Sequence, residues 1–170
     1  CVSLTSLDLS NFNTEKVINM SGMFQVCESL KKLDLQHVNT SKVINMTDMF
    51  YSCLALIDLD VTNFDTNQVT YMPSMFCCCK RLSNLDVSKF NTSKVVYMDN
   101  MFGHCEVLSS LDVTQFDTSK VEEMTGMFSD CKSLIILDVS NFNTSNVRSM
   151  GYMFAGCQLL TNLDVSHFDT

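Results

Sequence analysis

The sequence predicts an α/β repeat solenoid, with a parallel sheet on one side and short helices on the other. Three patterns with the same period predict it. A Leu-Asp pair followed by Leu or Val recurs from Leu7 to Leu163, and Met-x-x-Met-Phe recurs from Met20 to Met150. Cysteines recur every 26 residues, at positions 1, 27, 53, 79, 105, 131 and 157. A fixed period of 20–50 residues is typical of stacked supersecondary units.

Each repeat begins with a segment typical of a strand. In the fourth repeat, Leu85 and Val87 alternate with Asp86 and Ser88. This two-residue alternation places the apolar side chains on one face and the polar ones on the other. We therefore expect copies of the segment to pair in parallel along the stack.

A turn and then a helix are expected after the strand. Asn or Asp followed by Thr recurs after it, as in Asn91-Thr92, and Asn and Asp favour turns. The repeated Thr is expected to cap a turn or to bond to the next coil. Met101, Phe102, Cys105 and Leu108 then follow the spacing of one face of a short helix.

The full pattern reads Leu-x-x-Leu-Asp-Val-Ser-x-Phe-Asn-Thr-Ser-x-Val-x-x-Met-x-x-Met-Phe-x-x-Cys. It resembles the BspA-like class of leucine-rich repeats, which occurs in large surface proteins of bacteria and some protists. The resemblance implies a leucine-rich-repeat-like solenoid, a cell-surface or extracellular location and a role in adhesion. The second repeat departs most, with Gln36-His37-Val38 at the turn. Residues 1–170 are interpreted as one array of about six and a half repeats, excerpted from a longer protein.

Composition excludes several classes of function. The formal net charge of −8 argues against nucleic-acid binding, which depends on clustered Lys and Arg. The chain contains no run of 18 apolar residues, so we expect no membrane insertion in this segment. His37, His104 and His167 lie in different repeats without a recurrent nucleophile beside them. We therefore expect no catalytic residue, no cofactor and no enzymatic activity.

The cysteines and methionines are interpreted as core residues. The seven cysteines in register are predicted to be buried and reduced, because each repeat offers only one thiol on an apolar face. They are predicted to form neither disulfides nor a metal site. Cys77 and Cys78 are predicted to lie on the outer surface. The 12 methionines keep fixed repeat positions, which indicates core filling.

The recurrent aspartate is the candidate binding site. Asp34, Asp60, Asp86, Asp112 and Asp138 are predicted to project from a concave sheet, together with Asp8 and Asp164 near the ends. We call this set the acidic column. Charges about 5 Å apart repel by roughly 0.8 kcal/mol even in water, so the repulsion must be relieved. Hydrogen bonds from the adjoining turn are the main expectation; bound calcium and a partner-facing strip are the alternatives.

These features favour a non-enzymatic surface module that binds a protein or another surface macromolecule. A passive stalk or spacer without a ligand is the alternative, and a threonine-lined surface that acts on ice or crystals is a remote third. Repeat position six, beside the fixed aspartate, varies as Ser6, Lys32, Asp58, Asn84, Ser110, Ile136 and Asn162. Such variation suits a specific partner, although sequence drift would also produce it.

Overall fold

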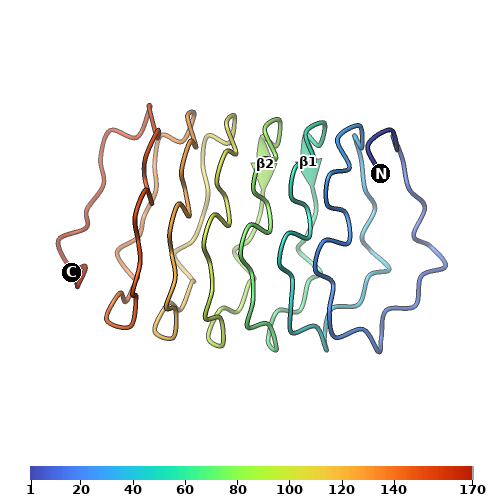
Figure 1. Cartoon of the computed structure of the whole chain (residues 1–170), viewed down its shortest axis with the longest axis horizontal. Helices are drawn as coiled ribbons and strands as arrows, with labels where there is room; N and C mark the ends of the chain where they lie inside the picture. The colour runs from blue at the N-terminus through green and yellow to red at the C-terminus, as the bar shows by residue number, and fades with distance from the viewer. Residues whose placement is uncertain (170) are drawn as a thin grey trace.

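The computed structural model describes residues 1–169. The chain winds into a row of coils that stand side by side, with the N-terminus at one end and the C-terminus at the other (Figure 1). Neighbouring coils are bonded through equivalent repeat positions. For example, the Ile44 amide donates to the Ile18 carbonyl, and the Thr70 amide donates to the Ile44 carbonyl. One turn of the coil therefore corresponds to one sequence repeat.

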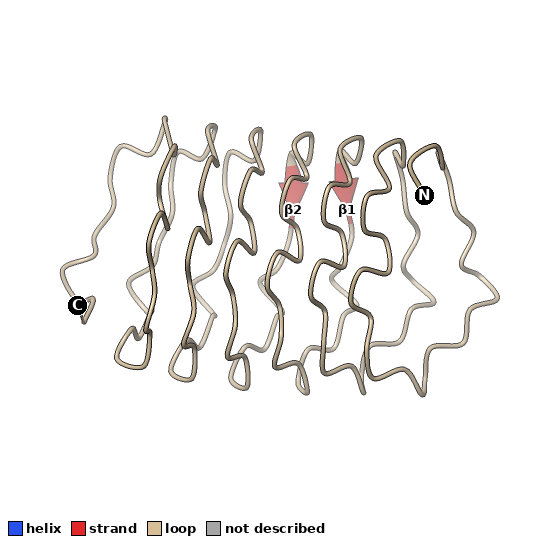
Figure 2. Cartoon of the chain, in the orientation of Figure 1, coloured by secondary structure: helices blue, strands red, loops and turns tan. Residues whose placement is uncertain are grey.

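Among residues 1–169, strands form in only two of the repeats for which they were predicted, and each strand is two residues long. β1 (Asp58–Leu59) and β2 (Asn84–Leu85) pair in parallel, with Asp58 opposite Asn84 and Leu59 opposite Leu85 (Figure 2). An isolated parallel bridge joins Ser110 to Ile136 at the same repeat position. The leucines are buried and the preceding residues are exposed, as the alternation predicted.

A second ladder extends much further along the stack. Parallel bridges connect Asn19, Asn45, Tyr71, Tyr97, Glu123 and Ser149 in succession. After each bridge, alternate amides donate to the next coil. In the third repeat the amides of residues 72, 74, 76 and 78 donate to the carbonyls of residues 97, 99, 101 and 103, at 2.8–3.1 Å. This ladder gives the coils most of their backbone contact.

The segments predicted to be helical contain no helix anywhere in residues 1–169. They form consecutive turns instead. In the fourth repeat the amides of Met101, Gly103 and Cys105 donate to carbonyls three residues earlier, at 3.0–3.2 Å. Asn100 and His104 have φ of 52° and 59°, the left-handed conformation that a right-handed helix excludes and that a type II turn places at its third residue.

Two successive four-residue turns explain why the pattern resembled a helix. A four-residue turn returns the chain to the same face after four residues, and an α-helix does so after 3.6 residues. The spacing of Met101, Phe102 and Cys105 therefore fits both structures. The leucine-rich-repeat-like class stays a prediction, with consecutive turns in place of its helices.

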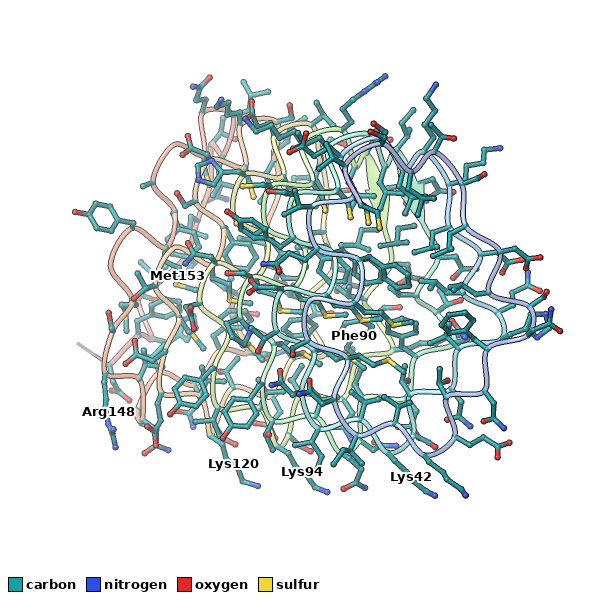
Figure 3. The ribbon with its side chains drawn as sticks, turned by 45° about the vertical axis from the view of Figure 1, so that its right-hand side comes forward. Lys42, Phe90, Lys94, Lys120, Arg148 and Met153 are labelled. Atoms are coloured by element: carbon teal, nitrogen blue, oxygen red, sulfur yellow. The ribbon has the colours of Figure 1, made fainter. Side chains whose placement is uncertain are left out.

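Stacked phenylalanines form the centre of the core. Phe24, Phe50, Phe76, Phe102, Phe128 and Phe154 stack in sequence, with ring centroids 5.5–5.9 Å apart. A second row, which includes Phe90 (labelled in Figure 3), packs against the first at 6.4–6.5 Å. The paired methionines fill the space around the rings, and between Met46 and Met127 they are fully buried, as predicted.

We predict that Phe102→Ala lowers the free energy of unfolding by about 3–5 kcal/mol, because it opens a cavity between two stacked rings. His104→Ser is the matched control, since Ser52 occupies that repeat position two coils earlier. Urea denaturation of the two variants and the wild type measures both effects. Equal losses in the two variants would contradict this account of the core.

Candidate functional site

Every aspartate of the acidic column is exposed and closes a local turn. Its Oδ1 atom accepts a hydrogen bond from the amide two residues further on, at 2.9–3.0 Å. The donors are Ser10, Gln36, Thr62, Ser88, Thr114, Ser140 and Ser166. This local bond satisfies an amide that would otherwise be free to bond to a neighbouring coil.

In the middle of the stack, a neighbouring hydroxyl adds a second hydrogen bond to the aspartate. Thr62, Ser88 and Thr114 each donate a 2.6 Å hydrogen bond to the same Oδ1 atom. The hydroxyl and amide bonds together lower the pKa of Asp60, Asp86 and Asp112 below the ordinary value. The carboxylates therefore stay ionised at neutral pH despite their mutual repulsion.

The second carboxylate oxygen remains available. Within residues 1–169, every side-chain hydrogen bond to the acidic column ends on Oδ1, so the Oδ2 atoms of these exposed residues have no hydrogen-bond partner in the chain. The arrangement thus combines the predicted hydrogen bonding to the turn with a row of accessible negative charge. Whether that row binds a partner stays a prediction.

Hollows flank the two ends of the acidic column. One, of about 290 Å³, is lined by Lys32, Asp34, Asp60 and Asn63, among others. The other, of about 370 Å³, lies beside Ile135, Ile136, Asp138 and Asp164. Both combine carboxylates with apolar surface.

Further basic side chains line another edge of the stack. Lys42, Lys94, Lys120 and Arg148 point outward along an edge away from β1 and β2 (Figure 3). On that edge Lys94 donates to Gln68, at 2.7 Å. Arg148 pairs with Glu122 at 3.0 Å, so this edge carries charges of both signs.

The recurrent threonine has a structural role. Thr66 is buried, and its hydroxyl donates to the Asn91 carbonyl at 3.0 Å and accepts from the Asn91 amide at 2.7 Å. Thr14, Thr40, Thr118 and Thr144 make the same pair of bonds to the following coil. The predicted bond to the next coil is thus present, and it reaches the backbone of the residue before the next threonine. Thr170, the last of this series, lies outside the described residues.

The cysteines in register also bond between coils, which the sequence interpretation missed. The thiols of Cys53, Cys79, Cys105, Cys131 and Cys157 donate to a Phe carbonyl of the preceding coil, at 3.1–3.3 Å. Burial raises the pKa of Cys53 and that of Cys131 to about 12. These thiols are therefore protonated donors and poor nucleophiles.

The prediction that all seven register cysteines are buried needs correction at the ends. Cys1 is exposed and Cys157 is half-buried, because each lies in a terminal coil of the structure. The surface assignment of Cys77 is also wrong: it is buried, whereas Cys78 is half-buried. All nine cysteines in the described chain are free thiols.

Residues 1–169 contain no group of three or more His, Cys, Asp or Glu side chains arranged to hold a metal ion. His104 Nδ1 lies 3.5 Å from Asp130 Oδ2, and His167 contacts the Val139 carbonyl at 3.0 Å. No helix among the described residues has the length and apolar character needed to cross a membrane.

Coils that repeat every 26 residues, with the same buried side chains and the same bonds between them, define a repeat protein. The chain belongs to DUF285, a family described as a Mycoplasma protein of unknown function, which matches residues 2–76 and 52–168. No curated protein matches the chain, and no solved structure does.

We predict that Thr66→Val lowers the free energy of unfolding by about 1–3 kcal/mol, because it removes the buried hydroxyl that pairs with the backbone amide and carbonyl of Asn91. Thr5→Val, at an exposed position, is the control and should change stability by less than about 0.5 kcal/mol. Denaturant unfolding of both variants measures the difference. An unaltered Thr66 variant would show that the inter-coil bonds are dispensable.

Thiol labelling tests the cysteine arrangement. In the native protein we expect an alkylating agent to modify Cys1 and Cys78 quickly, and Cys53, Cys79, Cys105 and Cys131 only after unfolding. Mass spectrometry of the labelled peptides gives the rate at each site. Rapid modification of the buried thiols would contradict the packing described above.

Proposed function

We propose that this chain is a non-enzymatic, BspA-like leucine-rich-repeat module of a cell-surface or extracellular protein that binds a macromolecular partner. The binding face carries Asp34, Asp60, Asp86, Asp112 and Asp138. The observation that carries the proposal is the row of unbonded Oδ2 atoms on exposed aspartates held in fixed orientation.

Preorganisation supports this role. Each carboxylate is already fixed by its turn, so a partner would bind it with little further loss of side-chain entropy. The turns lie on coils that are themselves bonded together, which keeps the charges at a regular spacing. Extended faces of this kind are the surfaces that solenoids use for binding.

The side chains beside the acidic column differ from coil to coil. Lys32, Asp58, Asn84, Ser110 and Ile136 flank the acidic column on successive coils. Ile57, Ile135 and Ile136 are 47%, 48% and 72% exposed on the same side of the coils. A partner with basic side chains spaced between apolar ones would complement this face in both charge and hydrophobicity.

A passive spacer is the second candidate, and the continuous inter-coil ladder favours it. Bridges join every coil from Asn19 to Ser149, as a stiff rod requires. A spacer has no need of an accessible charged face, however. The two proposals therefore differ in whether neutralising the acidic column changes binding.

Two double variants separate the structural role of the column from its charge. Asp86→Asn with Asp112→Asn keeps an Oδ1 acceptor for each turn but removes both charges. Asp86→Ala with Asp112→Ala removes the acceptor as well. A random peptide display library, selected on the immobilised wild type and counter-selected on the asparagine variant, should yield peptides rich in Lys and Arg. The binding of those peptides should weaken with added salt. Failure to enrich any peptide over the asparagine variant would favour the spacer.

The same variants predict a pH dependence. The pKa values of Asp86 and Asp112 are lowered in the folded state, so their ionised forms stabilise the fold above the unfolded pKa near 4. That contribution is lost as pH falls through the folded pKa. We expect the melting temperature of the wild type to fall more steeply between about pH 5 and pH 2 than that of the asparagine variant. The alanine variant should melt lower than the asparagine variant at pH 7. Identical pH profiles would contradict the assigned hydrogen bonds.

A further inference from the structure

The face that carries the acidic column also carries two apolar ridges. Ile57 forms the first ridge, and Ile135 with Ile136 forms the second; all three side chains are exposed. On the two coils between them, the same repeat positions hold small polar residues, Ser83-Asn84 and Ser109-Ser110. The isoleucines are therefore two separate apolar contact points with a polar stretch between them.

Backbone hydrogen bonds hold the two ridges in register. The amide and the hydroxyl of Ser83 both donate to the Ile57 carbonyl, at 2.9 and 3.2 Å. The Ile135 amide donates to the Ser109 carbonyl at 3.1 Å. Ile57 and Ile135 are equivalent residues three coils apart, so about 14 Å separates them at the spacing of about 4.8 Å between paired strands.

A cationic hollow lies beside the first ridge. It has a volume of about 470 Å³, and Ile57, Lys31 and Lys32 are among the residues that line it. Both lysines are exposed, and neither makes an ion pair within residues 1–169. The hollow beside the second ridge is lined by apolar, hydroxyl, amide and carboxylate side chains. The two ends of the face therefore differ in charge.

We propose that the partner contacts this face through an extended peptide segment with two apolar side chains four residues apart, an inference that rests on the function proposed above. Side chains at i and i+4 of a strand lie on the same face, about 13–14 Å apart. This separation matches that of the two ridges. A side chain at i+3 points to the opposite face of the strand, so it cannot reach the second ridge when residue i contacts the first.

The charges of the face determine the other side chains of the segment. Lys31 and Lys32 lie one coil beyond the first ridge, so they complement an acidic residue placed two positions outside the first apolar one. Basic residues between the two apolar ones complement Asp86 and Asp112, whose Oδ2 atoms have no hydrogen-bond partner in the chain. The segment therefore combines an acidic end, two apolar anchors and a basic middle.

Two synthetic peptides of identical composition test the spacing. In Glu-Ser-Leu-Lys-Lys-Lys-Leu the leucines are four residues apart, and in Glu-Ser-Leu-Lys-Lys-Leu-Lys they are three apart. Acetylated and amidated ends remove the terminal charges of both. We expect the first peptide to bind the wild type roughly 10-fold more tightly, because only this peptide places both leucines on the ridges. Fluorescence polarisation of labelled peptides measures the two affinities.

Removing either ridge should abolish this preference. The variants are Ile57→Ser and the double variant Ile135→Ser with Ile136→Ser, which copy the serines that other coils carry at the same positions. The fold should therefore be retained, and thermal melting checks that it is. Ile18→Thr is the matched control, because it removes an exposed isoleucine from the second ladder and copies Thr70. It should keep the preference.

Replacing the glutamate of the first peptide by glutamine tests the cationic hollow. This change should weaken binding to the wild type about two- to fivefold. It should have no effect on binding to the Lys31→Thr, Lys32→Ser variant, whose substitutions copy Thr5 and Ser6. Equal binding of the glutamate and glutamine peptides to the wild type would contradict the role given to the lysines.

The inference is overturned if neither peptide binds the wild type, if both bind equally, or if the preference survives in the folded serine variants. The Asp86→Asn, Asp112→Asn variant separates this outcome from the proposed function. Equal binding of both peptides that weakens in this variant would overturn the spacing and leave the acidic column a binding site. A preference that this variant keeps at full affinity would support the ridges and contradict the role of the column.

Discussion

The structure depends on how each coil divides its backbone amides between two directions. In the third repeat the amides of residues 72, 74, 76 and 78 donate to the next coil, whereas those of residues 75, 77 and 79 close turns within their own coil. Alternate amides thus hold the stack together, and the intervening ones shape the coil. This division forces a left-handed backbone at Ser74 and Cys78, and it recurs at every equivalent position from residue 22 to residue 156. An inserted residue would shift one coil against its neighbours, which accounts for the constant repeat length.

Buried polar side chains bond to backbone groups that the ladder leaves without partners. Where the chain turns after each strand, Thr66 and its equivalents bond to the amide and carbonyl of the following coil. At the end of the second of the two successive turns, the thiol of Cys79 donates to the Phe50 carbonyl of the preceding coil. Among the described residues no buried side-chain nitrogen or oxygen lacks a partner. Threonine and cysteine are therefore fixed by the same requirement as the apolar residues, because an unsatisfied buried group costs about as much as a lost methyl contact.

The sequence was sufficient to predict the period, the buried repeat positions and the turns at Asn or Asp. Each of these depends on local alternation or on a side chain that bonds within two residues. It was insufficient for the segment from Met98 to Cys105, where turn and helix share the same apolar spacing. The discriminating signal lay at the third residue of the first turn, which is Gly22, Asp48, Ser74, Asn100, Gly126 or Tyr152 in successive repeats. Gly and Asn favour a left-handed backbone, and none of these residues is a strong helix former. The thiol hydrogen bonds could not be anticipated, because they join residues 29 apart through a geometry that only the stacked coils create.

The division of each repeat into constant positions and variable exposed positions also bears on which partners the chain would bind. Asp86 and its equivalents are constant because each closes a turn, so the charge they present is the same on every coil. A uniform row of charge attracts many basic partners and discriminates poorly among them. Discrimination must therefore come from positions that the fold leaves free, such as Lys32, Asp58 and Ile136 beside the acidic column. In a repeat protein of this kind, the residues that break the pattern on the surface carry more information about function than those that maintain it.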